Sequence, residues 1–405
     1  MTPRKKILFI AEAVTLAHVG RPLALAGSLD PAQYEVTFAC AAGYDFCFRD
    51  SALQRRTIHS IPSAQFLQAL AAGQPVYDAA TLAGYVEEDL RLLRELQPDL
   101  VVGDFRLSLS VSARLAGVPY VALNNAYWSP YVRQQYTVPS LPLTRFLPIA
   151  LANTLFKLVR PLAFASHTMP MNKVRRQYGL PSLGRDLNRV YTDADYTLYA
   201  DVPQLFAAHG MPPNHAFIGP VLWSPPLPLP DWWAQLPADR PLVYVTLGSS
   251  GQAALLPGVL QALADLPLTV LAATAGKVAL GALPANAHAA DFLPGEQAAA
   301  RAALVLCNGG SPTSHQALVA GVPVLGLCGN LDQFLNMQGI AAAGAGARLR
   351  ADRFDPAALR QAVQALLATP QAATAARRVA QDFARYDAFQ LFSKLLSEIL
   401  TKPSV

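Results

Sequence analysis

The chain has 405 residues, of which 52% are hydrophobic and 15% charged, with a formal net charge of +5. This composition is typical of a globular protein with large cores and excludes a disordered chain. Nucleic acid is not expected as a partner, because no block of arginine and lysine is interleaved with aromatic residues. No uncharged stretch is long enough to span a bilayer, and four cysteines without metal-ligand spacing predict free thiols in a reducing, cytoplasmic compartment.

Apolar runs alternate with helical patterns along the first half of the chain. Strands are expected at residues 7–13, 34–41, 98–105 and 119–124, and helices at 18–29, 82–96 and 107–116. This alternation is typical of an α/β domain with a parallel sheet.

Two polar side chains follow strands of this expected sheet. His18 comes shortly after the first strand, and Asp104 lies at the end of the strand at 98–105. Because the carboxyl ends of parallel strands meet at one edge, where ligands bind, the two are candidates for one site. A carboxylate can hold an imidazole in the tautomer that a general base needs. A structural role for His18 and a helix-capping role for Asp104 are the alternatives.

Three further segments of the first half carry hypotheses. Tyr127 and Trp128 follow a strand, and they either line a ligand pocket or pack in the core. Residues 141–176 are apolar with interspersed cations, which is typical of a helical lid or of a basic amphipathic surface that contacts a membrane. Asp193 and Asp195 form an Asp-x-Asp motif, but they precede a strand instead of following one, which predicts turn residues and no metal site.

The most informative stretch is residues 304–336, in the second half of the chain. An apolar strand is followed by Gly309 and Gly310, and then by a helix start with Ser311 as the N-cap and Pro312 as the first helical residue. Free N–H groups and the helix dipole at such a turn favour a phosphate. Farther on, Asp332-Gln333 offers a carboxylate and an amide that suit sugar hydroxyls. Together these features predict a nucleotide sugar as ligand.

This stretch resembles the donor-binding signature of GT-B fold glycosyltransferases of the UDP-glycosyltransferase superfamily, which includes macrolide and plant enzymes. Asn308 stands where that family usually has a phosphate-binding His, and Gln316 where it usually has a ribose-binding Glu. Both replacements can still form hydrogen bonds. Asp291-Phe292-Leu293-Pro294 resembles the base-binding loop, with Phe292 as the stacking aromatic and Gly295 in place of the usual Gln.

Residues near the N-terminus extend the resemblance. His18-Val19-Gly20-Arg21-Pro22 is similar to the family's Gly-His-Val-x-Pro motif, with Ala17 in place of the Gly. The resemblance implies that His18 is the general base and Asp104 its orienting carboxylate, while Tyr127 and Trp128 bind the acceptor. It assigns donor binding to Gly248, Ser249, Ser250, Phe292, Leu293, Asn308, Gly309, Gly310, Ser311, Thr313, Gln316, Asp332 and Gln333.

The resemblance also implies two Rossmann-like domains with parallel sheets that face each other across a cleft. The expected boundaries are 1–220 for an acceptor-binding domain, 221–240 for a proline-rich linker, 241–385 for a nucleotide-sugar domain, and 386–405 for a helix that packs back on the first domain.

The implied reaction is an inverting, metal-independent transfer of a sugar from a UDP- or dTDP-sugar to a hydroxyl of an apolar small-molecule or lipid acceptor, without a cofactor. We expect a cytoplasmic protein, with peripheral membrane contact through 141–176 as a further hypothesis. The alternatives are a sugar-nucleotide 2-epimerase and a non-catalytic sugar-nucleotide-binding helper.

Overall fold

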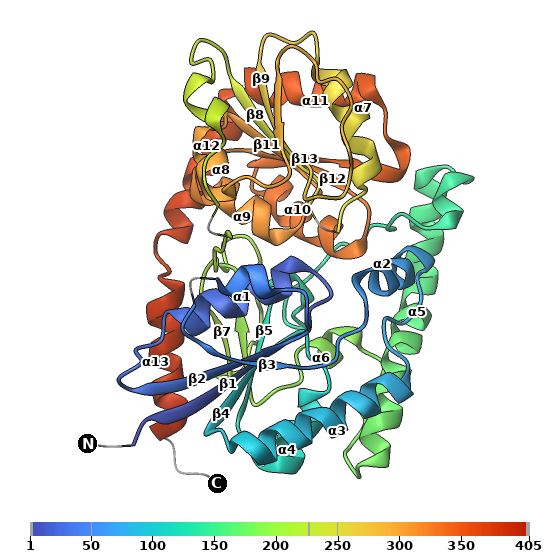
Figure 1. Cartoon of the computed structure of the whole chain (residues 1–405). Helices are drawn as coiled ribbons and strands as arrows, with labels where there is room; N and C mark the ends of the chain where they lie inside the picture. Colours follow the sequence, from blue (N-terminus) through green and yellow to red (C-terminus); the bar gives the residue numbers. More distant parts are fainter. Residues whose placement is uncertain (1–2, 50, 226, 249, 402–405) are drawn as a thin grey trace. The chain divides into compact units, whose positions relative to one another are not determined.

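The structure, a computed structural model, describes residues 3–49, 51–225, 227–248 and 250–401. The chain divides into two compact units, each built on a parallel sheet (Figure 1). Unit 1 consists of Met1–Arg133, Lys157–Trp223 and Tyr386–Val405, and unit 2 of Gln134–Phe156 and Ser224–Arg385. This is the α/β architecture of two Rossmann-like sheets that the sequence predicts.

The sheet of unit 1 has the order β3-β2-β1-β4-β5-β6-β7, and every paired strand is parallel. Its strands are β1 Lys5–Ala11, β2 Tyr34–Cys40, β3 Gln54–Thr57, β4 Leu100–Asp104, β5 Tyr120–Asn124, β6 Tyr196–Tyr199 and β7 His215–Phe217. The direction of winding reverses between β1 and β4, which are neighbours in the sheet. In open α/β sheets this reversal point is where ligands bind.

Helices cover both faces of this sheet (Figure 1). They are α1 Leu16–Gly27, α2 Ser63–Ala72, α3 Ala79–Leu96, α4 Leu109–Ala116, α6 Leu187–Tyr191 and α13 Ala388–Thr401, together with much of α5 Ile149–Gln177. Successive β1 side chains point to opposite faces, so Phe9 packs with α1 and α13, while Leu8 packs with α3 and α4. The rings of Phe9 and Phe392 lie 6.0 Å apart, which shows how α13 is anchored in unit 1.

The sheet of unit 2 has the order β10-β9-β8-β11-β12-β13, again with parallel pairs. Its strands are β8 Leu242–Thr246, β9 Thr269–Ala273, β10 Ala287–Ala290, β11 Leu304–Cys307, β12 Val324–Cys328 and β13 Gly346–Arg350. The helices are α7 Leu256–Leu263, α8 Gly295–Arg301, α9 Ser311–Val319, α10 Leu331–Ala342, α11 Pro356–Ala368 and α12 Pro370–Phe383. Here the winding reverses between β8 and β11.

Residues Gln134–Phe156 belong to unit 2, which corrects the expectation that they form part of the N-terminal domain. Hydrogen bonds tie this segment to β13 and to the loop after β12. The Arg350 guanidinium donates to the Val138 carbonyl at 2.7 Å, and the Ser140 N–H donates to the Gly329 carbonyl at 2.7 Å. Such contacts between distant parts of the chain leave no periodic signal in the sequence.

Asp193 and Asp195 are engaged in holding β6 in place. The Asp193 carboxylate accepts hydrogen bonds from Arg114 at 2.7 Å and from Arg175 at 2.6 Å. Asp195 accepts the Tyr120 N–H at 2.9 Å, at the start of the neighbouring strand β5. These partners give both carboxylates a structural role before β6.

A buried ion cluster lies behind the loops that follow β1 and β4. The Arg106 side chain is fully buried and donates to Glu12 at 3.0 Å, to Asp89 at 3.0 Å and to Glu88 at 2.9 Å. Burial raises the pKa of both Glu12 and Asp89, and the Arg106 charge opposes that rise. Glu12 directly follows β1 and Arg106 lies two residues after Asp104, the last residue of β4. The cluster therefore fixes the chain segments next to His18 and Asp104.

We expect Arg106→Met to lower the free energy of unfolding by about 3–5 kcal/mol at neutral pH, because it leaves buried carboxylates without their counter-charge. The loss should shrink toward about pH 5, since protonation then neutralises carboxyls whose folded-state pKa is raised. Urea unfolding at both pH values measures this. Arg56→Met is the matched control, because Arg56 is half-exposed and lies 3.8 Å from Glu95; it should cost less than about 1 kcal/mol. Equal losses in the two variants would contradict the cluster's role.

Candidate active site

The fold brings His18 and Asp104 together at the reversal point of the first sheet. His18 lies in the first turn of α1, which follows β1, and Asp104 is the last residue of β4. The His18 Nδ1 atom lies 2.8 Å from Asp104 Oδ1. The Asp104 side chain is fully buried, whereas 22% of the His18 side chain is exposed. The histidine can therefore meet a ligand while its partner stays shielded from water.

Arg21 is a third member of this cluster, and sequence reasoning missed it. Its Nε donates to Asp104 Oδ2 at 2.7 Å and its Nη2 to Oδ1 at 3.0 Å, while Nη1 donates to Asn125 Oδ1 at 2.9 Å. Residues three apart on a helix share a face, so α1 presents His18 and Arg21 to the same carboxylate. That spacing was a signal in the sequence, since both residues stand in the family-like motif.

Electrostatics keep the Asp104 carboxylate ionised. Burial acts to raise its pKa, but the Arg21 charge and the hydrogen bond from His18 outweigh burial and leave the pKa below its usual value. An ionised Asp104 accepts the proton on His18 Nδ1, which assigns the neutral imidazole the tautomer with a lone pair on Nε2. That tautomer is the one that can accept a proton from a ligand.

Phe105 fixes the plane of the imidazole ring. Its ring stacks on His18 with a centroid distance of 4.8 Å and an interplanar angle of 13°. The Phe105 backbone adopts φ +58°, a left-handed conformation that costs a bulky residue about 1–3 kcal/mol. Hydrogen-bonded neighbours on both sides, Asp104 and Arg106, hold this turn in place. The strain turns the aromatic ring toward the histidine.

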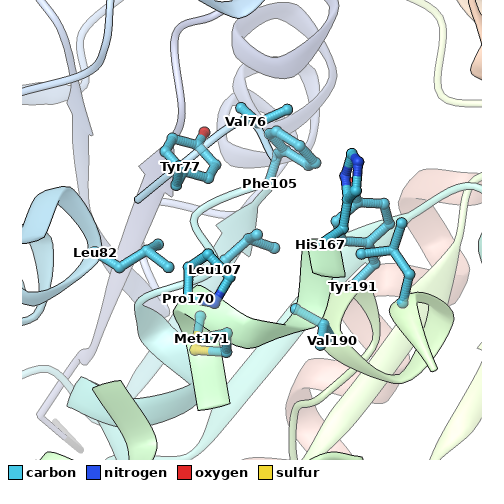
Figure 2. Close-up of a pocket in the computed structure, with 11 residues that line it drawn as sticks. Val76, Tyr77, Leu82, Phe105, Leu107, His167, Pro170, Met171, Val190 and Tyr191 are labelled. Atoms are coloured by element: carbon cyan, nitrogen blue, oxygen red, sulfur yellow. The ribbon is translucent and has the colours of Figure 1, made fainter. Parts of the chain in front are cut away.

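An apolar pocket lies in unit 1 on the other side of Phe105 (Figure 2). It is lined by Val76, Tyr77, Leu82, Phe105, Leu107, His167, Pro170, Met171, Leu187, Val190 and Tyr191. These side chains come from α3 and the segment before it, from α5, from α6 and from the segment after β4. Since Phe105 contacts both His18 and the pocket, a molecule bound there would share a wall with the candidate base.

The two aromatic residues predicted to bind an acceptor have different surroundings. Only 1% of Tyr127 is exposed, and its ring packs on Phe206 at 5.4 Å. It does not line the pocket of Figure 2, and a role for Tyr127 in acceptor binding stays a prediction. The Trp128 ring is half-buried and lies 5.0 Å from the ring of Tyr191, which does line the pocket. Trp128 therefore supports one wall of the pocket.

In unit 2, the turn between β11 and α9 has the geometry of an anion-binding loop. Gly309 adopts φ +85°, and a Cβ there would lie 2.8 Å from the sulfur of Cys328, so a side chain does not fit. Gly310 is the N-cap and Ser311 the first helical residue, one position earlier than expected from the sequence. Pro312 lies in the first turn, where the missing N–H costs little. The positive end of the α9 helix dipole at this turn favours a negatively charged ligand.

Asn308 links this turn to the loop after β8. Its Oδ1 accepts the Gly310 N–H at 3.0 Å, and its Nδ2 donates to Ser250 Oγ at 3.1 Å. Asn308 is buried, and the two loops follow the two strands between which the sheet reverses. The residue that replaces the family's His thus holds the two loops together.

The other departures from the family pattern contact each other. A Cβ on Gly295 would lie 2.5 Å from the side-chain oxygen of Gln316, so the glycine leaves room for the Gln316 amide. The Gln316 Nε2 donates to Ser224 Oγ at 3.0 Å. The two departures thus lie next to each other, with the amide of Gln316 beside the start of α8.

Gln333 and Asp332 lie at the start of α10. The Gln333 side-chain oxygen accepts the N–H groups of Gly329 at 2.8 Å and Asn330 at 3.2 Å, and thereby caps the helix. Its buried amide nitrogen has no hydrogen-bond partner among the residues that the structure describes. Buried donors are rarely left unmet, so this N–H₂ is available to a ligand. Asp332 is half-buried in the first turn of the same helix.

The remaining donor candidates lie around the same edge of the sheet. The Phe292 ring is 43% exposed beside Gly276 and can stack with a flat ligand, whereas Leu293 is buried. Gly248 follows β8 and Thr313 is half-buried in the first turn of α9. Ser249 lies outside the described residues. Among those described, no group of three or more His, Cys, Asp or Glu side chains is arranged to hold a metal ion.

Replacing Asn308 with Ala should weaken the binding of free nucleoside diphosphates by roughly 5- to 30-fold, because the loops lose their link and the Gly310 N–H and Ser250 hydroxyl lose a partner. Titration calorimetry with UDP and dTDP measures this. Asn286→Ala is the matched control. Asn286 lies just before β10, at the amino ends of the strands, and donates to the Leu263 and Leu268 carbonyls. Unchanged affinity in Asn308→Ala would remove the diphosphate from this loop.

Comparison with known proteins places these sites in a family. Residues 257–390 match the model of the erythromycin biosynthesis protein CIII-like C-terminal domain. The chain is 53% identical over 380 residues to a PGL/p-HBAD biosynthesis glycosyltransferase of Mycobacterium tuberculosis (strain ATCC 25177 / H37Ra), covering 94% of this chain and 89% of the relative. It is 54% identical over 382 residues to a PGL/p-HBAD biosynthesis rhamnosyltransferase of Mycobacterium bovis (strain BCG / Pasteur 1173P2), covering 94% and 85%.

Among solved structures, the spinosyn rhamnosyltransferase SpnG complexed with thymidine diphosphate aligns with a TM-score of 0.70 at 21% identity. The alignment covers 97% of this chain and 100% of that chain. At this identity the likeness shows the fold alone, which is GT-B. High identity over nearly the full length of the mycobacterial enzymes shows more. The chain is a glycosyltransferase that belongs to the family of the PGL/p-HBAD biosynthesis glycosyltransferases, within the UDP-glycosyltransferase superfamily.

Proposed function

We propose that this enzyme transfers a sugar from a nucleoside diphosphate sugar to a hydroxyl of an apolar acceptor, with inversion at the anomeric carbon and without a metal ion. The observation that carries this proposal is the hydrogen bond between His18 and the buried, ionised Asp104, beside an apolar pocket. An alcohol is too weakly acidic to ionise at neutral pH, so its attack needs a base that removes the proton as the bond forms.

In this mechanism His18 Nε2 takes the proton of the acceptor hydroxyl while the oxygen attacks the anomeric carbon. Asp104 orients the imidazole and stabilises the imidazolium that forms, without itself becoming protonated. Arg21 keeps the carboxylate ionised and fixes both of its oxygens, so it acts as a positioning residue. Attack from the face opposite the leaving group inverts the configuration.

Unit 2 supplies the binding groups for the donor. The diphosphate gains negative charge as its bond to the sugar breaks, and fixed N–H donors stabilise such charge without reorganising. The start of α9 and the linked loop of Ser250 carry these donors, which can replace a metal as the counter-charge. The Gln333 amide is suited to a sugar hydroxyl and the Phe292 ring to the base.

The apolar part of the acceptor is proposed to bind in the pocket that Phe105 lines, with the hydroxyl reaching past the Phe105 ring to His18. Its walls are mostly apolar and aromatic, with polar atoms from Tyr77, His167 and Tyr191, which favours a flat or hydrocarbon-like molecule bearing a hydroxyl. The cavity measures about 20 Å³, so its walls have to move apart to admit such a molecule. The relative named a rhamnosyltransferase and the fold neighbour complexed with thymidine diphosphate make dTDP-rhamnose the first donor to test, ahead of UDP-sugars.

A sugar-nucleotide 2-epimerase is the alternative reaction on this fold. Epimerisation requires acid and base groups at the sugar itself, whereas the carboxylate nearest to His18 is already paired with Arg21. The relatives named as glycosyltransferases also favour transfer. Mass spectrometry of the products separates a glycoside from an epimerised nucleotide sugar.

His18→Ala should lower kcat by roughly 10²- to 10⁴-fold, the usual contribution of a general base, while the affinity for free dTDP stays unchanged. Initial rates with dTDP-rhamnose and a phenolic acceptor, together with calorimetry, measure both quantities. His209→Ala is the control, because His209 is exposed in a loop of the same unit. Turnover of His18→Ala within a few-fold of wild type would exclude His18 as the base.

A further inference from the structure

Helix α5 carries an exposed apolar stripe along one face. Leu158, Leu162 and Met169 are 71%, 70% and 66% exposed, and all three lie in the part of α5 that belongs to unit 1. Their spacing of four and seven residues places them on one side of a helix. A row of this length on a protein surface marks an interaction site rather than a scatter of single residues.

Positive charge continues this stripe. Lys173 and Arg176 are exposed and follow Met169 at the same helical spacing, four and seven residues later. No aspartate or glutamate occurs anywhere between Asp104 and Asp186, although arginines and lysines occur throughout that stretch. The stripe thus combines large apolar side chains with cations that have no acidic neighbour on their own helix.

The opposite face of α5 is committed to unit 1. Arg175 is buried, donates to Asp193 at 2.6 Å and to the Pro181 carbonyl at 2.7 Å, and Met171 is buried beside Ser110. By length and composition α5 is the one helix among the described residues that could cross a membrane. Crossing would expose these ion pairs to hydrocarbon at high cost, so the helix is built to lie along a surface.

We propose that the stripe of α5 docks the enzyme on an anionic lipid bilayer. Interfacial helices bury an apolar row at the level of the headgroups, while lysine and arginine remain in contact with lipid phosphates. A second copy of the chain fits the stripe less well, because α5 offers no carboxylate to meet Lys173 and Arg176 of another α5. A bilayer provides both the apolar layer and the negative charge.

The inner face of the same helix lines the apolar pocket through His167, Pro170 and Met171 (Figure 2). If the pocket holds the acceptor, as the proposed function has it, then docking brings a lipid-soluble acceptor to the pocket without passage through water. Docking itself rests only on the stripe. Vesicle binding therefore tests it independently of whether sugar transfer occurs.

The test is flotation of the full chain with vesicles of phosphatidylcholine alone and of phosphatidylcholine mixed with phosphatidylglycerol. We expect binding to the mixed vesicles that weakens with salt. The double variant Leu158→Ser/Leu162→Ser should lose about tenfold or more in affinity, and Lys173→Gln/Arg176→Gln should lose the preference for anionic vesicles. Leu115→Ser, at a leucine of α4 that is 42% exposed, is the matched control and should bind like wild type.

Three outcomes would overturn the proposal. The first is that the wild type does not bind vesicles, and the second is that the Leu115→Ser control loses as much affinity as the double variant. The third is a dimer that forms without lipid in sedimentation velocity and that Leu158→Ser/Leu162→Ser dissociates. Such a dimer would show that a second copy covers the stripe. Unchanged dTDP binding by both double variants shows that they are folded. Loss of vesicle binding with retained transfer to a water-soluble acceptor separates docking from catalysis.

Discussion

One buried carboxylate organises the first half of this protein. Asp104 accepts hydrogen bonds from His18 on one oxygen and from Arg21 on both, and none of its surface is exposed. An unpaired charge at such a position would cost several kcal/mol, so the pair with Arg21 is what allows Asp104 to stay ionised beside the histidine. Asp104 lies where the strand order reverses between β1 and β4. The Arg106 cluster fixes the loops that follow these two strands.

Unit 2 follows a comparable principle with neutral groups. Its sheet also reverses direction, between β8 and β11, and the side chain of Asn308 joins the loops that follow those two strands. A charged His at this place could contribute to phosphate binding directly. The Asn308 amide instead holds the two loops in a fixed arrangement. The positive end of the α9 dipole is then the main attraction for an anion. Gly295 and Gln316, the two other departures from the donor signature, are likewise neighbours in this unit.

Much of this arrangement could be predicted from patterns in the sequence. The apolar runs at 304–307 and 324–328 correspond to β11 and β12. The positions of His18 after β1 and of Asp104 at the end of β4 follow from the alternation of strands and helices. Arg21 and Phe105 were not predicted, because their roles depend on a side-chain pairing and on a strained turn that periodicity does not express. For Tyr127 the sequence leaves two alternatives open, since an aromatic residue after a strand can face either the core or a pocket. The placement of Gln134–Phe156 in unit 2 rests on long-range hydrogen bonds alone.

The central claim is that a neutral histidine drives direct displacement at the anomeric carbon. The stereochemistry of the product tests this claim most directly. Nuclear magnetic resonance of the glycoside formed from dTDP-rhamnose gives the one-bond carbon–hydrogen coupling at the anomeric centre, which distinguishes the two anomers. The account predicts a product of inverted configuration relative to the donor. A product that retains the donor's configuration would contradict it, because a direct displacement from the face opposite the leaving group inverts the anomeric carbon.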